Sequence, residues 1–335
     1  MKRQILISLA LILAAVSLTL FAVAPSELVN AARAPQIDGD LDEWLAKSER
    51  EANAKEALIP ETGKRIRWFQ GRKNTRTRFS VVYLHGFSAT RQEIAPVGEL
   101  IADGLEANLF ETRLAGHGHL DNPLQGVRAE DWLEDAAEAL SIGAMIGEQV
   151  IVMGTSTGAT LALAMAEHPS FEPVSTIVLL SPNFAPRDVN ARFLTWPGGP
   201  QLAEMVAGKT RSWEPKNELQ ALYWSTTYPM AAAVEMMRLV QYVRVRLPMR
   251  LQPALLTIYS PKDTVVDTGR IVEAFGQMDS PRKQLIAIPG SGDSSNHVLA
   301  GDILAPENNQ PIAEQIIAFI RPDIGVADPV GYSSE

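Results

Sequence analysis

From residue 66 onward, short apolar runs rich in β-branched and aromatic residues alternate with longer segments in which apolar residues recur every three or four positions. The runs predict strands and the longer segments predict helices. Strands separated by helices are typical of a mostly parallel sheet that is covered on both faces. We therefore predict a single doubly wound α/β domain with strands at residues 66–69, 79–84, 108–112, 150–153, 176–180, 254–259 and 284–288.

Residues 185–250 interrupt this alternation, because they contain no convincing strand and are rich in tryptophan, tyrosine and methionine. A segment inserted between two strands of a doubly wound sheet lies at the carboxyl ends of those strands, where ligands bind. We therefore interpret residues 185–250 as a cap or lid, with extra helices packed elsewhere on the core as the alternative. The α/β core then comprises residues 64–184 and 251–322, and residues 323–335 form a polar tail.

Residues 1–24 differ from the rest of the chain. Lys2 and Arg3 precede an uncharged and mainly apolar run at residues 5–24, a pattern typical of a signal peptide or of a single membrane-spanning helix. Both interpretations predict export of the remaining chain. Because the run exceeds the usual signal core of about 7–15 residues and Pro25 follows it directly, we favour a membrane anchor with the chain facing outward over a cleaved periplasmic or secreted form.

Residues 25–63 connect this segment to the core. They contain proline and glycine at several positions and a charged helical pattern at residues 41–57. Leu41, Trp44 and Leu45 form a short apolar stripe on that helix, which we interpret as a packing surface. We therefore predict a stalk that carries one accessory helix.

The composition excludes several classes of function. The chain has 335 residues, of which 46% are hydrophobic and 21% charged, as expected for a globular protein. A net charge of -9 argues against nucleic acid as a partner, and we interpret the densest basic run, at residues 64–78, as a solvated sheet edge. The absence of cysteine removes disulfides, thiolate catalysis and cysteine-ligated metals.

The segment around Ser156 carries the strongest chemical signal. An apolar strand at residues 150–153 leads into Gly154-Thr-Ser156-Thr-Gly158 and then into a helix rich in alanine and leucine. A serine on such a sharp turn is exposed for attack, and glycines two positions on either side let neighbouring backbone approach. Because this pattern arises by chance in roughly one chain in ten of this length, its place between a strand and a helix is what makes Ser156 a candidate nucleophile.

A serine nucleophile needs a base that takes its proton and an acid that orients the base. Asp263 follows the strand at residues 254–259, and His297 follows the last strand. Asp267 is the main rival for the acid and Asp293 a lesser one, but Asp263 is closest to a strand end, where side chains are placed most rigidly. The other histidines fit less well, because they precede the serine or end its helix: His85, His117, His119 and His168.

The same chemistry requires two N–H groups that stabilise an oxyanion. The strand at residues 79–84 leads into His85-Gly86-Phe87, a loop suited to supply one of them. We therefore predict the N–H groups of Phe87 and Thr157 as donors, with His85 and Gly86 as support. An ordinary turn punctuated by Gly86 is the alternative.

With these segments assembled, the chain resembles the α/β-hydrolase superfamily, and most of all its carboxylesterase and monoacylglycerol-lipase branch. The resemblance covers about residues 64–320 and rests on His85-Gly86-Phe87, Leu114-Ala-Gly-His117-Gly118, Gly154-Thr-Ser156-Thr-Gly158, Asp263 with Val265 and Val266, and Asn296-His297.

This resemblance implies an α/β-hydrolase fold with a helical cap inserted between two late strands. It also implies a triad of Ser156, His297 and Asp263, an oxyanion hole at Phe87 and Thr157, an acyl-enzyme intermediate and no cofactor. The threonines on either side of the serine are less usual for the family, so the shape of the acyl site does not transfer. We interpret His117 as part of a structural loop, with a catalytic role as the alternative.

The leading hypothesis is hydrolysis of a carboxylic ester through an acyl-enzyme on Ser156. Monoacylglycerols, lysolipids and short-chain esters are candidate substrates, because the cap is rich in aromatic residues and methionine. An acyltransferase or amidase with the same triad and a catalytically silent binding protein at the membrane are the alternatives. The expected partners are a small acyl ester and, through residues 1–24, a membrane, without a metal or cofactor.

Overall fold

The computed structural model describes residues 28–29 and 32–324. Its centre is a seven-stranded sheet in which β1 pairs antiparallel with β3 and all other neighbours are parallel. The prediction of a mostly parallel sheet is therefore confirmed. The spatial order is β1 (Arg65–Arg67), β3 (Asn108–Glu111), β2 (Thr77–Leu84), β4 (Gly147–Thr155), β5 (Val174–Leu180), β9 (Ala254–Tyr259) and β11 (Lys283–Ala287).

Helices cover both faces of this sheet, as a doubly wound arrangement requires. Successive residues of a strand point to opposite faces, and in β2 Val81 and Tyr83 pack with one set of helices whereas Val82 and Leu84 pack with the other. The first set is α3 (Val97–Gly104) and α10 (Asn309–Ile320), and the second is α4 (Ala129–Ile146), α5 (Thr157–Ala164) and α9 (Thr268–Gly276).

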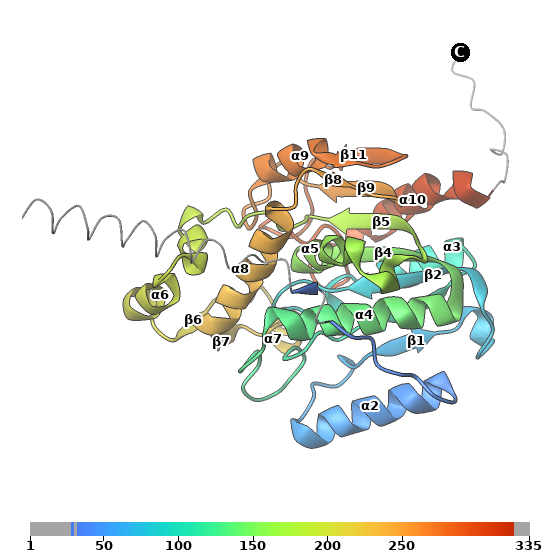
Figure 1. The fold of residues 1–335 in the computed structure, drawn as a ribbon, viewed down its shortest axis with the longest axis horizontal. Helices are drawn as coiled ribbons and strands as arrows, with labels where there is room; N and C mark the ends of the chain where they lie inside the picture. The colour runs from blue at the N-terminus through green and yellow to red at the C-terminus, as the bar shows by residue number, and fades with distance from the viewer. Residues whose placement is uncertain (1–27, 30–31, 325–335) are drawn as a thin grey trace, which may run out of the picture.

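The cap is inserted between β5 and β9, which confirms the predicted insertion between two late strands. Figure 1 shows its elements α6, β6 and β7 together at one end of the sheet. They are α6 (Gly199–Ala207), β6 (Thr210–Ser212), α7 (Glu218–Tyr223), β7 (Thr227–Pro229), α8 (Met230–Arg244) and β8 (Met249–Arg250), preceded by a 3-10 helix, η7 (Val189–Thr195).

The expectation that residues 185–250 contain no strand is wrong. β6 and β7 form an antiparallel pair, and β8 pairs with β10 (Met278–Asp279). These strands have only two or three residues each, and β6 is fully exposed. A strand of that length without a buried face cannot produce the alternating pattern by which strands are recognised.

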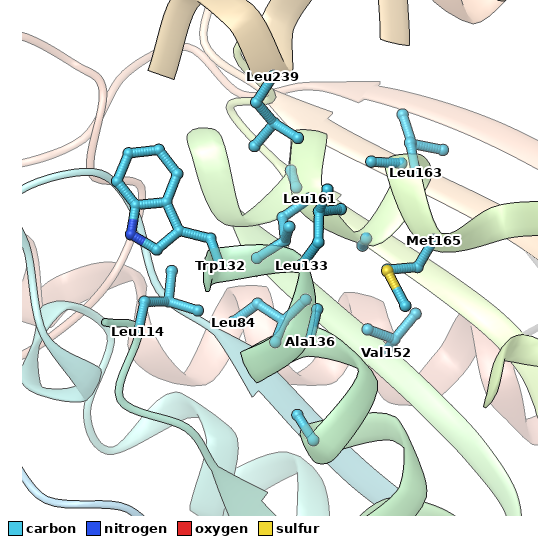
Figure 2. Packing of buried hydrophobic residues seen from close by; sticks show 14 of the residues in the cluster. Leu84, Leu114, Trp132, Leu133, Ala136, Val152, Leu161, Leu163, Met165 and Leu239 are labelled. Carbon is cyan, nitrogen blue, oxygen red and sulfur yellow. The ribbon is translucent and has the colours of Figure 1, made fainter. Parts of the chain in front are cut away.

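The largest hydrophobic cluster joins the sheet, its helices and the cap. Figure 2 shows Leu84 of β2 and Val152 of β4 packed against Leu133 of α4 and Leu161 of α5, with Leu239 of α8 above them. All five side chains are fully buried. This cluster fixes α5, and with it the turn that carries Ser156, between the sheet and the cap.

The predicted accessory helix is α2 (Leu41–Lys55), which ends two residues earlier than expected. Asp40 caps its first turn by accepting from the Glu43 N–H. Leu41 and Leu45 are buried against the core, as expected for a packing stripe. Figure 1 shows α2 next to β1, so this part of the predicted stalk packs on the domain.

Smaller differences concern the ends of elements. The strand predicted at residues 66–69 ends at Arg67, because a 3-10 turn follows, η3 (Phe69–Gly71), in which Gln70 has a φ of 52°. The other 3-10 turns are η4 (Arg91–Glu93), η5 (Met165–Glu167), η6 (Pro169–Phe171), η8 (Pro306–Asn308) and η9 (Arg321–Ile324).

The predicted signal or anchor at residues 1–24 lies outside the described residues, as do residues 325–335 of the tail. Both remain predictions. Within residues 28–29 and 32–324, no helix has the length and apolar character needed to cross a membrane.

Two glycines allow α5 to approach the ends of β2 and β4. A Cβ atom on Gly158 would lie 2.1 Å from the Leu84 carbonyl oxygen and 2.6 Å from that of His85. A Cβ atom on Gly154 would lie 2.5 Å from the Gly158 carbonyl oxygen. The glycines on either side of Ser156 are therefore required by close packing of backbone on backbone.

We expect Gly158→Ala to lower the free energy of unfolding by about 2–4 kcal/mol, since the clash involves backbone that cannot rotate away. Gly276→Ala is the matched control, because no atom outside its two chain neighbours and the backbone of its own helix lies within 4 Å of the added Cβ. This variant should be neutral or slightly stabilising. Urea denaturation of both variants measures the difference. Equal stabilities would contradict the close packing of α5.

Candidate active site

Ser156 lies in the sharp turn between β4 and α5. Its backbone has φ 53° and ψ -114°, a conformation that costs a non-glycine residue roughly 1–3 kcal/mol and that clusters at functional sites. Neighbouring backbone holds the turn: the Ser156 N–H donates to the Leu180 carbonyl at 2.8 Å, and the Ser156 carbonyl accepts from the Asn183 N–H at 3.1 Å. Ser156 thus has a fixed position beyond the carboxyl ends of β4 and β5.

Asp263 and His297 come from two different loops and are in direct contact. Nδ1 of His297 lies 2.7 Å from Oδ2 of Asp263, and Oδ1 of Asp263 accepts from the N–H groups of Val265 and Val266 at 2.7 and 3.0 Å. Because an ionised carboxylate only accepts hydrogen bonds, His297 donates from Nδ1. Its Nε2 is then the nitrogen that can accept a proton.

Asp267, the main rival for the acid, does not take this position. Its side chain caps α9 by accepting from the Arg270 N–H. Asp263 is fully buried, whereas the carboxylate of Asp267 belongs to an exposed helix start.

Asp293, the lesser rival, holds the loop that carries the histidine. Its carboxylate also pairs with Lys216 of the cap. Although burial raises the pKa of Asp293, the hydrogen bonds from Lys216, Ser295 and the backbone lower it to about 2. The loop N–H groups that donate to Asp293 belong to Ser295, His297 and Val298.

Three carboxylates act on His297. Burial disfavours the imidazolium, but the hydrogen bond and charge of Asp263, together with the charges of Glu93 and Asp293, outweigh it and raise the pKa of His297 above 6.5. A histidine that accepts a proton this readily is suited to act as a general base.

Of three successive N–H groups in the loop after β2, the outer two have hydrogen-bond partners and the middle one has none among the described residues. The Gly86 N–H donates to Oε2 of Glu93 at 2.8 Å, and the Ser88 N–H donates to Nε2 of His117 at 3.1 Å. Between them, the Phe87 N–H has no hydrogen-bond partner in the part of the chain that the structure describes. The loop is thus fixed on both sides of a free donor, as an oxyanion site requires.

His85 and His117 support this loop as neutral imidazoles. Burial lowers the pKa of His85 to about 4 and that of His117 well below its usual value. Nδ1 of His85 lies 3.0 Å from the Gly86 carbonyl, and its Nε2 accepts from the Leu114 N–H. Nδ1 of His117 lies 3.0 Å from the Ala115 carbonyl. Each ring therefore donates at one nitrogen and accepts at the other, which only the neutral form can do.

A cavity of about 880 Å³ lies between the core and the cap, within the size range of small-molecule sites. Ser156, His297, Phe87 and Thr157 all line it. Thr157 is the first residue of α5, so its N–H has no partner within the helix. The remaining predicted residues do not line the cavity: Asp263, His85, Gly86, Gly154 and Gly158. The cap contributes mainly apolar side chains, among them Leu194, Trp213, Trp224, Tyr228, Met230 and Met236.

Sequence reasoning missed two residues of this region, Glu93 and Lys216. Glu93 is buried and lines the cavity, and its position shortly after Phe87 was a usable signal. Lys216 lies in a polar stretch of the cap. Its ion pair with Asp293 of a distant loop cannot be recognised from the neighbouring residues in the sequence.

A model of the alpha/beta hydrolase family matches residues 81–306, which is more than half of the chain. The chain belongs to the alpha/beta hydrolase family. This hydrolase is also 26% identical over 211 residues to the thermostable monoacylglycerol lipase of Bacillus sp. (strain H-257), a match that covers 63% of the hydrolase and 81% of the relative. The resemblance to the superfamily and its monoacylglycerol-lipase branch is therefore confirmed.

Solved structures share the fold of this hydrolase. One is a metagenome-derived lipolytic enzyme from work on LipS and LipT, with a TM-score of 0.64 and 20% identity over 79% of the hydrolase and 99% of that chain. Another is a monoacylglycerol lipase from Paleococcus ferrophilus, with a TM-score of 0.58 and 12% identity over 76% of the hydrolase and 98% of that chain. At sequence identities this low, these two structures are evidence for a shared fold alone.

We expect Asp293→Asn to destabilise the hydrolase by roughly 2 kcal/mol at pH 7, since the charge opposite Lys216 is lost. Because the pKa of Asp293 is lowered to about 2 in the folded protein, its stabilisation is present above the ordinary value of 3.8 and is lost as the pH falls toward 2. The difference from wild type in urea unfolding should therefore shrink over that range.

The control for this experiment is Asp267→Asn, which should leave stability unchanged because asparagine caps a helix as well as aspartate does. A variant at position 293 that is as stable as wild type at pH 7 would contradict the role of Asp293 in holding the loop.

Proposed function

We propose that this hydrolase cleaves carboxylic esters through an acyl-enzyme on Ser156. The observation that carries the proposal is the contact between His297 and Asp263 at the wall of the cavity that Ser156 also lines. A buried carboxylate, an imidazole whose Nε2 can accept a proton and a serine on a strained turn form the usual set for nucleophilic acyl transfer. The monoacylglycerol lipase relative supports an ester as the substrate.

In the first half of the proposed reaction, Oγ of Ser156 attacks the ester carbonyl while its proton passes to Nε2 of His297. The negative charge that develops on the carbonyl oxygen is stabilised by the N–H groups of Phe87 and Thr157. Asp263 holds the ring in the correct orientation and stabilises the imidazolium. The tetrahedral intermediate then collapses: the bond to the alkoxy oxygen breaks, and that oxygen receives the proton from His297.

In the second half, water enters in place of the alcohol. His297 takes a proton from the water, whose oxygen attacks the acyl carbonyl of the Ser156 ester. The new intermediate breaks its bond to Oγ of Ser156, which regains the proton, and the carboxylic acid leaves. The net reaction consumes one ester and one water and releases one alcohol and one carboxylic acid.

The lining of the cavity supports an amphiphilic acyl ester as the substrate, such as a monoacylglycerol, a lysolipid or a short-chain ester. Most of the side chains that the cap contributes are aromatic or aliphatic, and such surface binds an acyl chain by the hydrophobic effect. Adaptable methionines at positions 230 and 236 suit chains of more than one length.

Ser156→Ala is expected to abolish hydrolysis of 4-nitrophenyl esters, with kcat reduced by roughly 10⁵-fold or more. The variant should unfold at the same temperature as wild type, because alanine removes only the hydroxyl. Measurement of initial rates with esters of increasing acyl length gives both the loss and the preferred chain length. Wild-type rates in the Ser156→Ala variant would rule out the proposed nucleophile.

The rate should fall as the pH falls through the pKa of His297, because only the neutral ring takes the proton of Ser156. Since that pKa is raised above 6.5, kcat/KM should reach half its plateau above pH 6.5. Asp263→Asn removes a charge that raises it, so the acidic limb should move to lower pH while the plateau falls by up to ~10⁴-fold. An acidic limb that stays in place would contradict the role of Asp263, and Asp267→Asn serves as the control.

A further inference from the structure

Glu93 is a buried carboxylate that the proposed reaction has not yet used. It is 3% exposed and lies at the end of η4, six residues after Phe87. In the described part of the chain it forms no ion pair with a lysine or arginine, whereas its neighbour Arg91 pairs with Glu111. A buried carboxylate without a basic partner is costly to the fold, so a functional reason for it is expected.

The hydrogen bonds of Glu93 link two parts of the active site. Its Oε2 accepts from the Gly86 N–H at 2.8 Å and from the Tyr83 hydroxyl at 2.9 Å. The Tyr83 hydroxyl also lies 3.0 Å from Oγ1 of Thr155. Glu93 therefore connects the residue before Phe87 with the residue before Ser156.

Gly86 is shaped to receive this carboxylate. A Cβ atom at position 86 would lie 2.8 Å from Oε1 of Glu93, closer than van der Waals contact allows. The glycine before Phe87 thus lets Glu93 approach the loop directly. The loop after His297 packs against the backbone of Glu93, since a Cβ atom on Gly301 would lie 2.4 Å from the carbonyl oxygen of Glu93.

Glu93 also acts on His297 through its charge. Both residues line the cavity, and the negative charge of Glu93 and the positive charge of the protonated His297 stabilise each other. Burial raises the pKa of Glu93. The hydrogen bonds from Gly86 and Tyr83 and the charge of His297 offset part of this rise. The interaction is strongest when the ring is protonated, which is the state that follows proton transfer from Ser156. The charged groups near the ring are Asp263, Glu93, Asp293 with its partner Lys216, and Arg187, which donates to the Asp263 carbonyl.

We propose that Glu93 is a positioning residue of this hydrolase, which holds the Phe87 N–H in place and stabilises the imidazolium of His297 with a second carboxylate. The inference rests on the proposed ester hydrolysis. It adds a carboxylate that acts on the ring through its charge from the loop after β2, whereas Asp263 is hydrogen-bonded to the ring from the loop after β9.

Glu93→Gln tests this role, because glutamine keeps the size and one acceptor oxygen but has no charge. We expect kcat for 4-nitrophenyl ester hydrolysis to fall roughly 10- to 100-fold, as for other supporting partners of an active site. KM should stay within about threefold, since Glu93 acts through the loop and the ring rather than through the acyl chain. The acidic limb of the kcat/KM profile should move to lower pH, because the charge that favours the imidazolium is gone.

Glu99→Gln is the matched control. Glu99 lies on α3, pairs with Arg65 at 2.5 Å and does not line the cavity, so its kcat and pH profile should equal those of wild type. Glu93→Met provides a second neutral variant of similar length, which needs no hydrogen-bond partner and should show the same loss and the same shift.

A Glu93→Gln variant with wild-type kcat and an unmoved acidic limb would overturn the proposal. So would a loss of kcat with an unmoved limb, because this would indicate a purely structural role, and so would failure of both neutral variants to fold. The proposed function fails separately, if wild-type hydrolysis is absent or survives Ser156→Ala.

Discussion

The close packing of α5 on the ends of β2 and β4 is the constraint on which the rest of the site depends. Backbone meets backbone at Gly154 and Gly158, and no side chain fits between them. This contact forces the chain to turn sharply at Ser156, which adopts a positive φ that serine rarely takes. The hydrophobic cluster beneath α5 offsets the strain, so the proposed nucleophile is held at the cavity wall before any substrate binds.

Around this turn, charge is arranged to favour a protonated histidine. Asp263 is hydrogen-bonded to the ring, the charge of Glu93 favours the protonated ring from the neighbouring loop, and Asp293 fixes the backbone of the loop that carries His297. Lys216 of the cap forms an ion pair with Asp293. Because the cap also forms most of the apolar lining, the groups that would bind an acyl chain and the groups that would move the proton are mechanically connected.

The fold was predictable because the inner strands of the central sheet, β2, β4, β5 and β9, are largely buried apolar runs. The β9 strand at Ala254–Tyr259 was predicted to the residue. The short strands β6 and β8 were not, since two or three residues carry no periodic pattern. The residues proposed as the triad could be named from local motifs and chain order. Glu93 lies close in sequence to its partner Gly86 and offered a signal that was not used. Lys216 could not be named, because its partner Asp293 lies in a loop that only the tertiary structure brings near it.

The central claim is that the acyl group of the substrate passes through a covalent bond to Ser156. Rapid acid quench of the hydrolase during turnover of a slowly hydrolysed ester, followed by mass spectrometry of its peptides, tests this most directly. We predict a mass increase equal to the acyl group on the peptide that contains Ser156, which disappears as turnover ends. Turnover with no acylated peptide, or with the acyl group on another residue, would contradict the account.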